Sequence, residues 1–261
     1  MAKKNLSTKD NTLKTILVLG GLCLLLVGFY FYNKRGGNLD GSNENVAAVT
    51  EKDGVKQEPS DAPPENLTYV FIENVPFTSQ APFGDWKDPR QQDGCEEASV
   101  LMAMRWVKGE SLTKEQALEE ILAMSKFEED KYGDYHDTSS EDTVKRLFND
   151  YYSYDKVKTV FDIKIEDIKK ELAAGHLVIV PADGQKLGNP NFTGAGPERH
   201  KLVIRGYDDK KSQFITNDPG TRKGEKYRYD YDVLINAVRD YLTGYKVPIV
   251  GERKAMIVVE K

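Results

Sequence analysis

The pattern of apolar and polar positions beyond residue 67 is helical at first and strand-like later. Residues 95–107 (CEEASVLMAMRWV) repeat apolar side chains at helical spacing, which predicts a helix that begins at Cys95. Capping-box spacing and a helix-ending glycine predict three more helices: one near Thr113 and Gln116, one near Thr138 and Glu141, and one over 165–174 before Gly175.

Apolar, β-branched segments dominate the later part of the chain. The expected strands cover 67–72, 177–180, 201–207, 213–216 and 256–259, and a helix is expected over 229–241. Because most of the helices precede the strands, the pattern indicates an α+β fold in which N-terminal helices pack on a C-terminal antiparallel sheet.

An uncharged run, 15–32 (TILVLGGLCLLLVGFYFY), precedes this domain. Its length is close to the minimum for a bilayer-spanning helix and no small-residue cleavage site follows it promptly, so an uncleaved anchor is favoured over a signal peptide. Four lysines before the run and two basic residues after it predict a cytoplasmic N-terminus (1–14) and a single-pass protein of the cytoplasmic membrane. Residues 33–66 are typical of a flexible linker, which leaves 67–261 as one domain outside the membrane.

Charge and cysteine content narrow the possible functions. The net charge of −5 and the pI near 5.4 argue against a nucleic-acid-binding protein. Cys23 lies in the apolar run, so Cys95 is the only cysteine of the predicted domain, which excludes an intramolecular disulfide and a multi-cysteine zinc site there. Such a lone thiol is either an inert buried residue or a nucleophile, and without context the inert role is the more common one.

The position of Cys95 favours a nucleophile. It follows Gly94 and opens a helix, whose N-terminus favours negative charge and therefore the reactive thiolate. Glu96 and Glu97 suit the helix dipole, but their charges oppose a thiolate. The position therefore helps the thiolate, while its immediate neighbours do not.

A general base for this thiol is best supplied by His200. This residue begins the strand HKLVIRGY, and a turn over 208–210 leads into SQFITND, so a hairpin would place His200 within a residue of Asp218 in register. A carboxylate beside an imidazole fixes its tautomer, although Asp218 before Pro-Gly has an alternative role as a turn residue. His136 in a polar loop and His176 after a helix end lack such a partner in the pattern.

An acyl-transfer site also needs donors for an oxyanion. The backbone N–H of Cys95 is one candidate. The side-chain amide of Gln80, or of Gln91 or Gln92, is the second, and the residues alone leave this choice open. The segment 187–198 (LGNPNFTGAGPE) before His200 is either a mobile loop over a cleft or an ordinary connection.

The order glutamine, helix-opening cysteine, strand-opening histidine and acid resembles the papain-like cysteine peptidases. More narrowly, the blocks NVPFTSQAPFGDW, DGCEEASVLMAM, LGNPNFTGAGPERHKLVIRGYD and FITNDPGTRKGEKYRY resemble the bacterial branch related to double-glycine-leader peptidases, cysteine-peptidase family thirty-nine. The resemblance spans about 70–260. It implies a papain-like fold with Cys95 as nucleophile, His200 as general base, Asp218 as orienting acid and Gln80 as oxyanion donor.

The chain also departs from that pattern. Gln80 lies farther from the cysteine than in the leader peptidases, and Glu96-Glu97 replaces the Gly-Pro or Gly-x that usually follows the cysteine. Leader processing is not carried over, because those peptidases are commonly fused to an exporter.

These observations predict a cysteine peptidase that hydrolyses peptide or related amide bonds through a thioester acyl-enzyme, with no metal or organic cofactor. Its expected partners are a peptide or protein substrate, of which cell-wall peptide is suggested by location alone, and the membrane through 15–32. Two alternatives remain open: transglutaminase-like acyl transfer to an amine, and a non-catalytic binding module of the same fold.

Overall fold

A computed structural model of the chain describes residues 67–251 and 253–261. The predicted N-terminal segment, membrane anchor and linker (1–14, 15–32 and 33–66) lie outside this described part. Within it, no helix has the length and apolar character needed to cross a bilayer.

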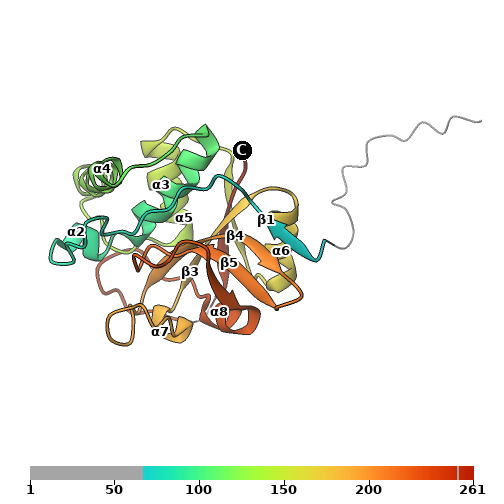
Figure 1. The fold of residues 1–261 in the computed structure, drawn as a ribbon. Coiled ribbons are helices and arrows are strands. Elements are labelled where there is room, and N and C mark those ends of the chain that lie inside the picture. The colour runs from blue at the N-terminus through green and yellow to red at the C-terminus, as the bar shows by residue number, and fades with distance from the viewer. Residues whose placement is uncertain (1–66, 252) are drawn as a thin grey trace, which may run out of the picture. The chain divides into compact units, whose positions relative to one another are not determined.

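Helices fill most of the first half of the described chain (Figure 1). They are α2 (Pro89–Gln92), α3 (Cys95–Lys108), α4 (Lys114–Tyr132), α5 (Ser140–Thr143) and the π-helix η1 (Val144–Tyr151). Three further helices, α6 (Ile165–Ala173), α7 (Gly184–Leu187) and α8 (Tyr231–Ala237), lie among the later strands. The predicted helix starts at Cys95 and Thr113 are confirmed, the latter with a complete capping box. The predicted cap Thr138 is wrong by one residue, because the side chain that accepts the Asp142 N–H is that of Ser139.

The strands form one antiparallel sheet of order β2-β7-β3-β4-β5-β6, and β1 pairs with β4 beyond the end of β3. They are β1 (Tyr69–Phe71), β2 (Val157–Phe161), β3 (Leu177–Ala182), β4 (His200–Asp208), β5 (Gln213–Asn217), β6 (Tyr227–Asp230) and β7 (Ala255–Val259). This arrangement confirms the α+β prediction. The helix predicted over 229–241 is shorter, because residues 227–230 instead pair with β5 as a strand that the sequence pattern did not reveal.

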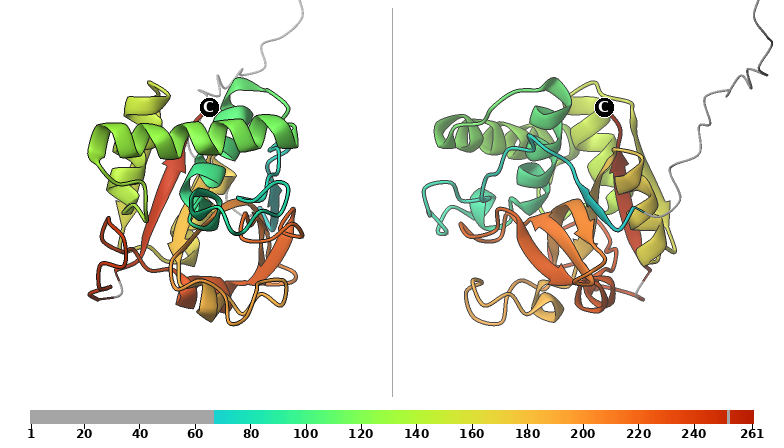
Figure 2. Two further views of the ribbon diagram at one scale, coloured as in Figure 1. Left: turned by 90° about the vertical axis from the view of Figure 1, so that its left-hand side faces the viewer. Right: turned by 45° about the vertical axis from the view of Figure 1, so that its right-hand side comes forward.

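Two apolar cores lie on opposite faces of the sheet. Along β3, Leu177 and Ile179 join the core that contains the buried side chains of α3 and α4, whereas Val178 and Val180 join the core beneath α6 and α8. The sheet is therefore covered on both faces, which is why β3, β4 and β7 are buried along their whole length. Figure 2 shows α3 and α4, in green, on one side of the yellow to red strands.

Candidate active site

The nucleophile candidate Cys95 is the first residue of α3 and is 4% exposed. Only Asp93 and Gly94 separate α3 from α2, and a Cβ at Gly94 would lie 2.6 Å from the carbonyl oxygen of Arg90. Glycine is therefore required for α2 to pack this closely against the start of α3.

The Cys95 thiol donates a hydrogen bond to Glu96 Oε2 at 2.9 Å. Burial and the Glu96 carboxylate together raise the pKa of the thiol well above its ordinary value. The helix start was expected to favour a thiolate and the neighbouring acids to oppose it. Burial is the largest cause of this raised pKa, and the opposing effect foreseen for Glu96 adds to it.

Glu96 is part of a buried cluster that joins α3 to β4. Its Oε1 accepts from Lys201 Nζ at 3.1 Å and from the Tyr241 hydroxyl at 2.7 Å, and Lys201 Nζ also bonds the Thr138 carbonyl and the Tyr241 hydroxyl. Burial alone would raise the pKa of Glu96, but Lys201 and the hydrogen bonds lower it. Ser99 Oγ adds a bond to the Lys201 carbonyl. The residue before Lys201 is His200, so this cluster fixes the first turn of α3 against the strand end that carries the candidate base.

Replacing Glu96 by glutamine is expected to lower the pKa of Cys95, because the charge that opposes the thiolate is removed while Lys201 stays nearby. The pH at which Cys95 alkylation by iodoacetamide reaches half its maximal rate should be roughly one unit or more lower than in the wild type. Peptide-level mass spectrometry separates Cys95 from Cys23 in this assay. Glu119→Gln, which removes an exposed charge of α4, is the matched control; an unchanged pH profile for the Glu96 variant would contradict the assigned electrostatics.

His200 and Asp218 meet at the open end of the β4–β5 hairpin. His200 Nε2 lies 2.7 Å from Asp218 Oδ1, and both side chains are buried. The ladder register, Val203 with Asn217, would place His200 opposite Gly220 when continued, so the predicted register is off by two residues. The cause is a turn longer than predicted, since Asp208 pairs with Gln213; the irregularity between Ile204 and Gly206 brings His200 one position closer to Asp218. His200 and Asp218 are therefore diagonal neighbours on one face, a geometry that long side chains span.

The Asp218 carboxylate is held by four donors. Oδ1 accepts from His200 and from the Gly220 N–H at 2.9 Å, whereas Oδ2 accepts from the Tyr229 hydroxyl at 2.5 Å and from Asn189 Nδ2 at 3.4 Å. Burial would raise the pKa of Asp218, but His200 and these hydrogen bonds hold it below its ordinary value. Sequence reasoning missed Tyr229 and Asn189, and no spacing signal marked either of them.

The second imidazole nitrogen of His200, Nδ1, is buried and has no hydrogen-bond partner among the residues of the described part. Asp218 fixes the proton on Nε2, which leaves the lone pair on Nδ1. Phe192 packs edge-on against the ring, with centroids 5.4 Å apart. His200 is thus oriented as a base whose accepting atom is Nδ1.

Gln80 is hydrogen-bonded to α2, the short helix that directly precedes Cys95. Its Nε2 donates to the carbonyl oxygens of Gln91 at 3.1 Å and Gln92 at 2.7 Å, and its backbone N–H donates to the Pro219 carbonyl. Both amide hydrogens are therefore used within the protein. Gln91 is buried in α2, whereas Gln92 is exposed.

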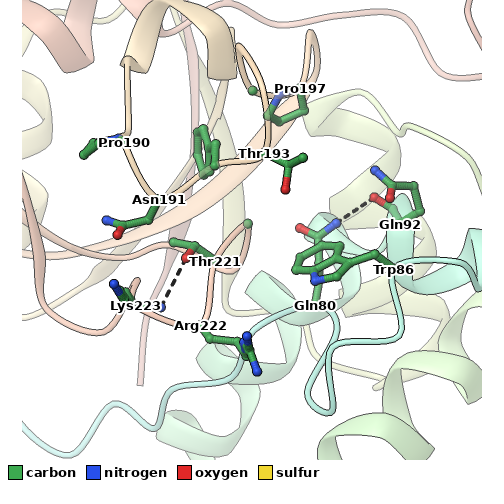
Figure 3. A pocket seen from close by; sticks show the side chains of 13 residues that line it. Gln80, Trp86, Gln92, Pro190, Asn191, Thr193, Pro197, Thr221, Arg222 and Lys223 are labelled. Atoms are coloured by element: carbon green, nitrogen blue, oxygen red, sulfur yellow. Dashed lines mark hydrogen bonds between the residues drawn. The ribbon is translucent and has the colours of Figure 1, made fainter.

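A pocket of about 880 Å³ opens beside these residues. Figure 3 shows Gln80, Trp86 and Gln92 on one wall, the loop from Pro190 to Pro197 on another, and Thr221, Arg222 and Lys223 below. The segment 187–198, predicted as a loop before His200, thus supplies part of the pocket wall, together with Phe192 and Gly196.

The other two histidines lie elsewhere and have carboxylate partners of their own. His136 Nδ1 contacts Asp134 at 2.6 Å, and His176 Nδ1 contacts Glu171 at 2.7 Å. A carboxylate partner therefore does not by itself distinguish His200. Among the described residues, no group of three or more His, Cys, Asp or Glu is arranged to hold a metal ion.

Two further buried acids, Glu97 of α3 and Glu128 of α4, influence each other. Glu97 Oε1 accepts from Ser125, and burial together with Glu128 raises the pKa of Glu97. Burial and Glu96 raise the pKa of Glu128 to about 8, although Arg146 lies 3.8 Å away. A raised folded-state pKa means that the native state binds more protons than the unfolded state, so stability is lost as the pH rises from about 4.5 through about 8.

Glu128→Gln should therefore be about as stable as the wild type at pH 5 and more stable by about 2–4 kcal/mol at pH 8. Chemical denaturation at both pH values measures this difference. Glu129→Gln, an exposed neighbour on α4, should show no such pH-dependent gain. Equal effects of the two substitutions would rule out Glu128 as the titrating group.

The comparison with protein-family models identifies the family of the chain. The model of the Peptidase_C39 like family matches residues 72–246, a segment that contains Gln80, Cys95, His200 and Asp218. The chain belongs to the Peptidase_C39 like family. The sequence-based resemblance to family thirty-nine is thereby confirmed, and the matched segment runs from the end of β1 to beyond α8.

Among solved structures, the chain matches a crystal structure described as that of a C39-like peptidase from Bacillus anthracis. The match has a TM-score of 0.46 and 16% identity and covers 74% of this chain and 98% of that one. The search of curated proteins gave no match.

Proposed function

We propose that this member of the Peptidase_C39 like family is a cysteine peptidase, with Cys95 as nucleophile, His200 as general base and Asp218 as the acid that orients it. The observation that carries the proposal is the His200–Asp218 hydrogen bond at 2.7 Å, which leaves Nδ1 as the unpaired nitrogen of a buried imidazole. His200 begins β4, and the Lys201–Glu96 ion pair holds this end of the strand against α3, the helix that carries Cys95.

In the proposed reaction the Cys95 thiol turns from Glu96 Oε2 toward His200 Nδ1. Nδ1 takes the thiol proton while Sγ attacks the substrate carbonyl carbon, and the imidazolium then returns that proton to the leaving amine as the C–N bond breaks. Water next attacks the thioester carbonyl, with its proton again taken by Nδ1, and Sγ leaves with that proton. Asp218 stabilises the imidazolium in both steps. Because the resting thiol is protonated, the base acts during attack rather than before it.

The developing oxyanion is proposed to bind the backbone N–H of Cys95, one of the N–H groups at the start of a helix that have no helical partner. We propose Gln80 as the second donor. Its longer bond, to the Gln91 carbonyl at 3.1 Å, is the one that a rotation of the amide would release for the oxyanion.

The proposal is tested by incubating the full-length protein with a peptide library made from a digested proteome, and separately with cell-wall peptides. The expected result is cleavage by the wild type and none by Cys95→Ala, with new termini identified by mass spectrometry. Cleavage that persists in Cys95→Ala, or its absence from both proteins, would contradict the proposal. A labelled amine in the same mixture would reveal acyl transfer, since the amine would then appear on the new C-termini.

We also propose that residues 15–32 anchor the protein in the cytoplasmic membrane, with the peptidase domain outside. Support comes from the uncharged run and from the lysines that precede it. In cells, protease added from outside should remove the domain without lysis; complete protection would contradict this orientation.

A further inference from the structure

We infer that the pocket beside the candidate site selects peptides that carry a carboxylate close to the scissile bond, and that Arg222 binds this carboxylate. This inference rests on the proposed peptidase function and adds its substrate class.

Two of the residues that line the pocket contact the candidate base. Gly220 touches the candidate base so closely that a Cβ there would lie 2.9 Å from His200 Cε1. Phe192 packs its ring against the same imidazole. A peptide segment bound in this pocket would therefore lie next to the candidate base, and the pocket volume of about 880 Å³ suffices for several residues of such a segment.

The pocket is lined by positive charge, whereas the protein as a whole is negatively charged. The chain has a net charge of −5, yet the residues that line the pocket include the cations Arg222 and Lys223 and no acid. The acids adjacent in sequence to lining residues have other contacts: Asp85 accepts from the Lys87 N–H, Asp93 lies 3.8 Å from His136, and Glu198 pairs with Arg199. No carboxylate of the wall thus neutralises these two cations.

Arg222 differs from the other arginines of the described part of the chain. Each of the others either pairs with a carboxylate or, for Arg205, donates to backbone carbonyls: Arg90, Arg105, Arg146, Arg199, Arg205, Arg228, Arg239 and Arg253. The Arg222 guanidinium has neither kind of partner in that part and lies beside the Gly84 turn, where a built Cβ would be 3.8 Å away. Five donors in a planar fork are thus left free at the pocket wall.

A carboxylate is the group that fits this guanidinium. Arginine binds carboxylates through two parallel hydrogen bonds, and such charge-assisted bonds are stronger than neutral ones. Trp86 and Phe192 supply apolar surface for the rest of the bound segment. The carboxylate has two sources in a peptide, an Asp or Glu side chain and the C-terminus, and the test separates them.

The test uses the full-length protein and a proteome-derived peptide library, and it compares the wild type with Arg222→Gln and Lys223→Gln. Cleavage by the wild type should be enriched in sites with Asp, Glu or a free C-terminus within a few residues of the cut. Synthetic pairs that differ only by Glu against Gln should differ about tenfold in kcat/KM, and Arg222→Gln should abolish most of that difference. C-terminally amidated copies of the peptides distinguish a side-chain carboxylate from a terminal one.

Lys210→Gln is the matched control, because it removes an exposed positive charge in the turn between β4 and β5. It should leave the preference unchanged. Equal cleavage of acidic and neutral peptides by the wild type, or a preference that survives Arg222→Gln, would overturn the inference while leaving Cys95-dependent cleavage, and hence the proposed function, intact. If the wild type shows no Cys95-dependent cleavage at all, both the inference and the proposed function are overturned.

Discussion

Replacing His200 by alanine is expected to lower Cys95-dependent peptide cleavage by about 10³-fold, mainly in kcat. The resting thiol is protonated, since burial and Glu96 raise its pKa, so attack requires a base that accepts its proton at that moment. His200 Nδ1 is the group with a free lone pair at this strand end. Substrate binding depends on the pocket walls rather than on the imidazole, so KM should change little.

His176→Ala is the matched control for this prediction. That histidine also pairs with a carboxylate, Glu171, but it lies at the start of β3 outside the pocket, and its loss should leave cleavage within about twofold. Cleavage by His200→Ala within tenfold of the wild-type rate, in a protein that remains folded, would remove His200 from the mechanism.

Lys201→Met is expected to destabilise the protein by about 3–5 kcal/mol, the cost of leaving a buried charge without its partner. Lys201 and Glu96 are both buried, and the ammonium also bonds the Thr138 carbonyl and the Tyr241 hydroxyl. For a domain of this size the melting temperature should fall by roughly 6–20 °C. Chemical denaturation gives the free energy directly.

The double variant Glu96→Gln with Lys201→Met separates the pair from other effects of the substitution. If the lost ion pair is the cause, the double variant should be more stable than Lys201→Met alone, because no uncompensated carboxylate remains. Strictly additive losses would instead indicate that Lys201 contributes through packing and its other hydrogen bonds.

Local signals in the sequence predicted the helix that carries Cys95 and the hairpin that carries His200 and Asp218. The periodicity of residues 95–107 and the turn at 208–210 are properties of neighbouring residues, and these determine helix starts and hairpins. The exact register was not predictable in the same way. It depends on the length of the turn, since Asp208 pairs with Gln213, and on the irregularity between Ile204 and Gly206, where the buried Arg205 bonds carbonyls of the distant residues Ile72 and Val75.

The groups that tune the site could not be predicted because they come from distant parts of the chain. Tyr241 is 145 positions from Glu96, and Lys201 is 105 positions from it. The sequence marked Glu96 as unfavourable to a thiolate, which is correct, but its bond to the thiol and its pairing with Lys201 depend on how α3 packs against β4. Tyr229 was missed for a related reason, since the segment that holds it forms a strand only by pairing with β5.

The central claim, that Cys95 is the nucleophile of a peptidase, is tested most directly by titrating activity against covalent modification. An epoxide probe is added in small steps to the full-length protein, and both the modified fraction of the Cys95 peptide and the rate of library cleavage are measured. The account predicts that cleavage falls in proportion to Cys95 modification and reaches zero at one adduct on that residue. Undiminished cleavage by a protein whose Cys95 is fully modified would contradict it.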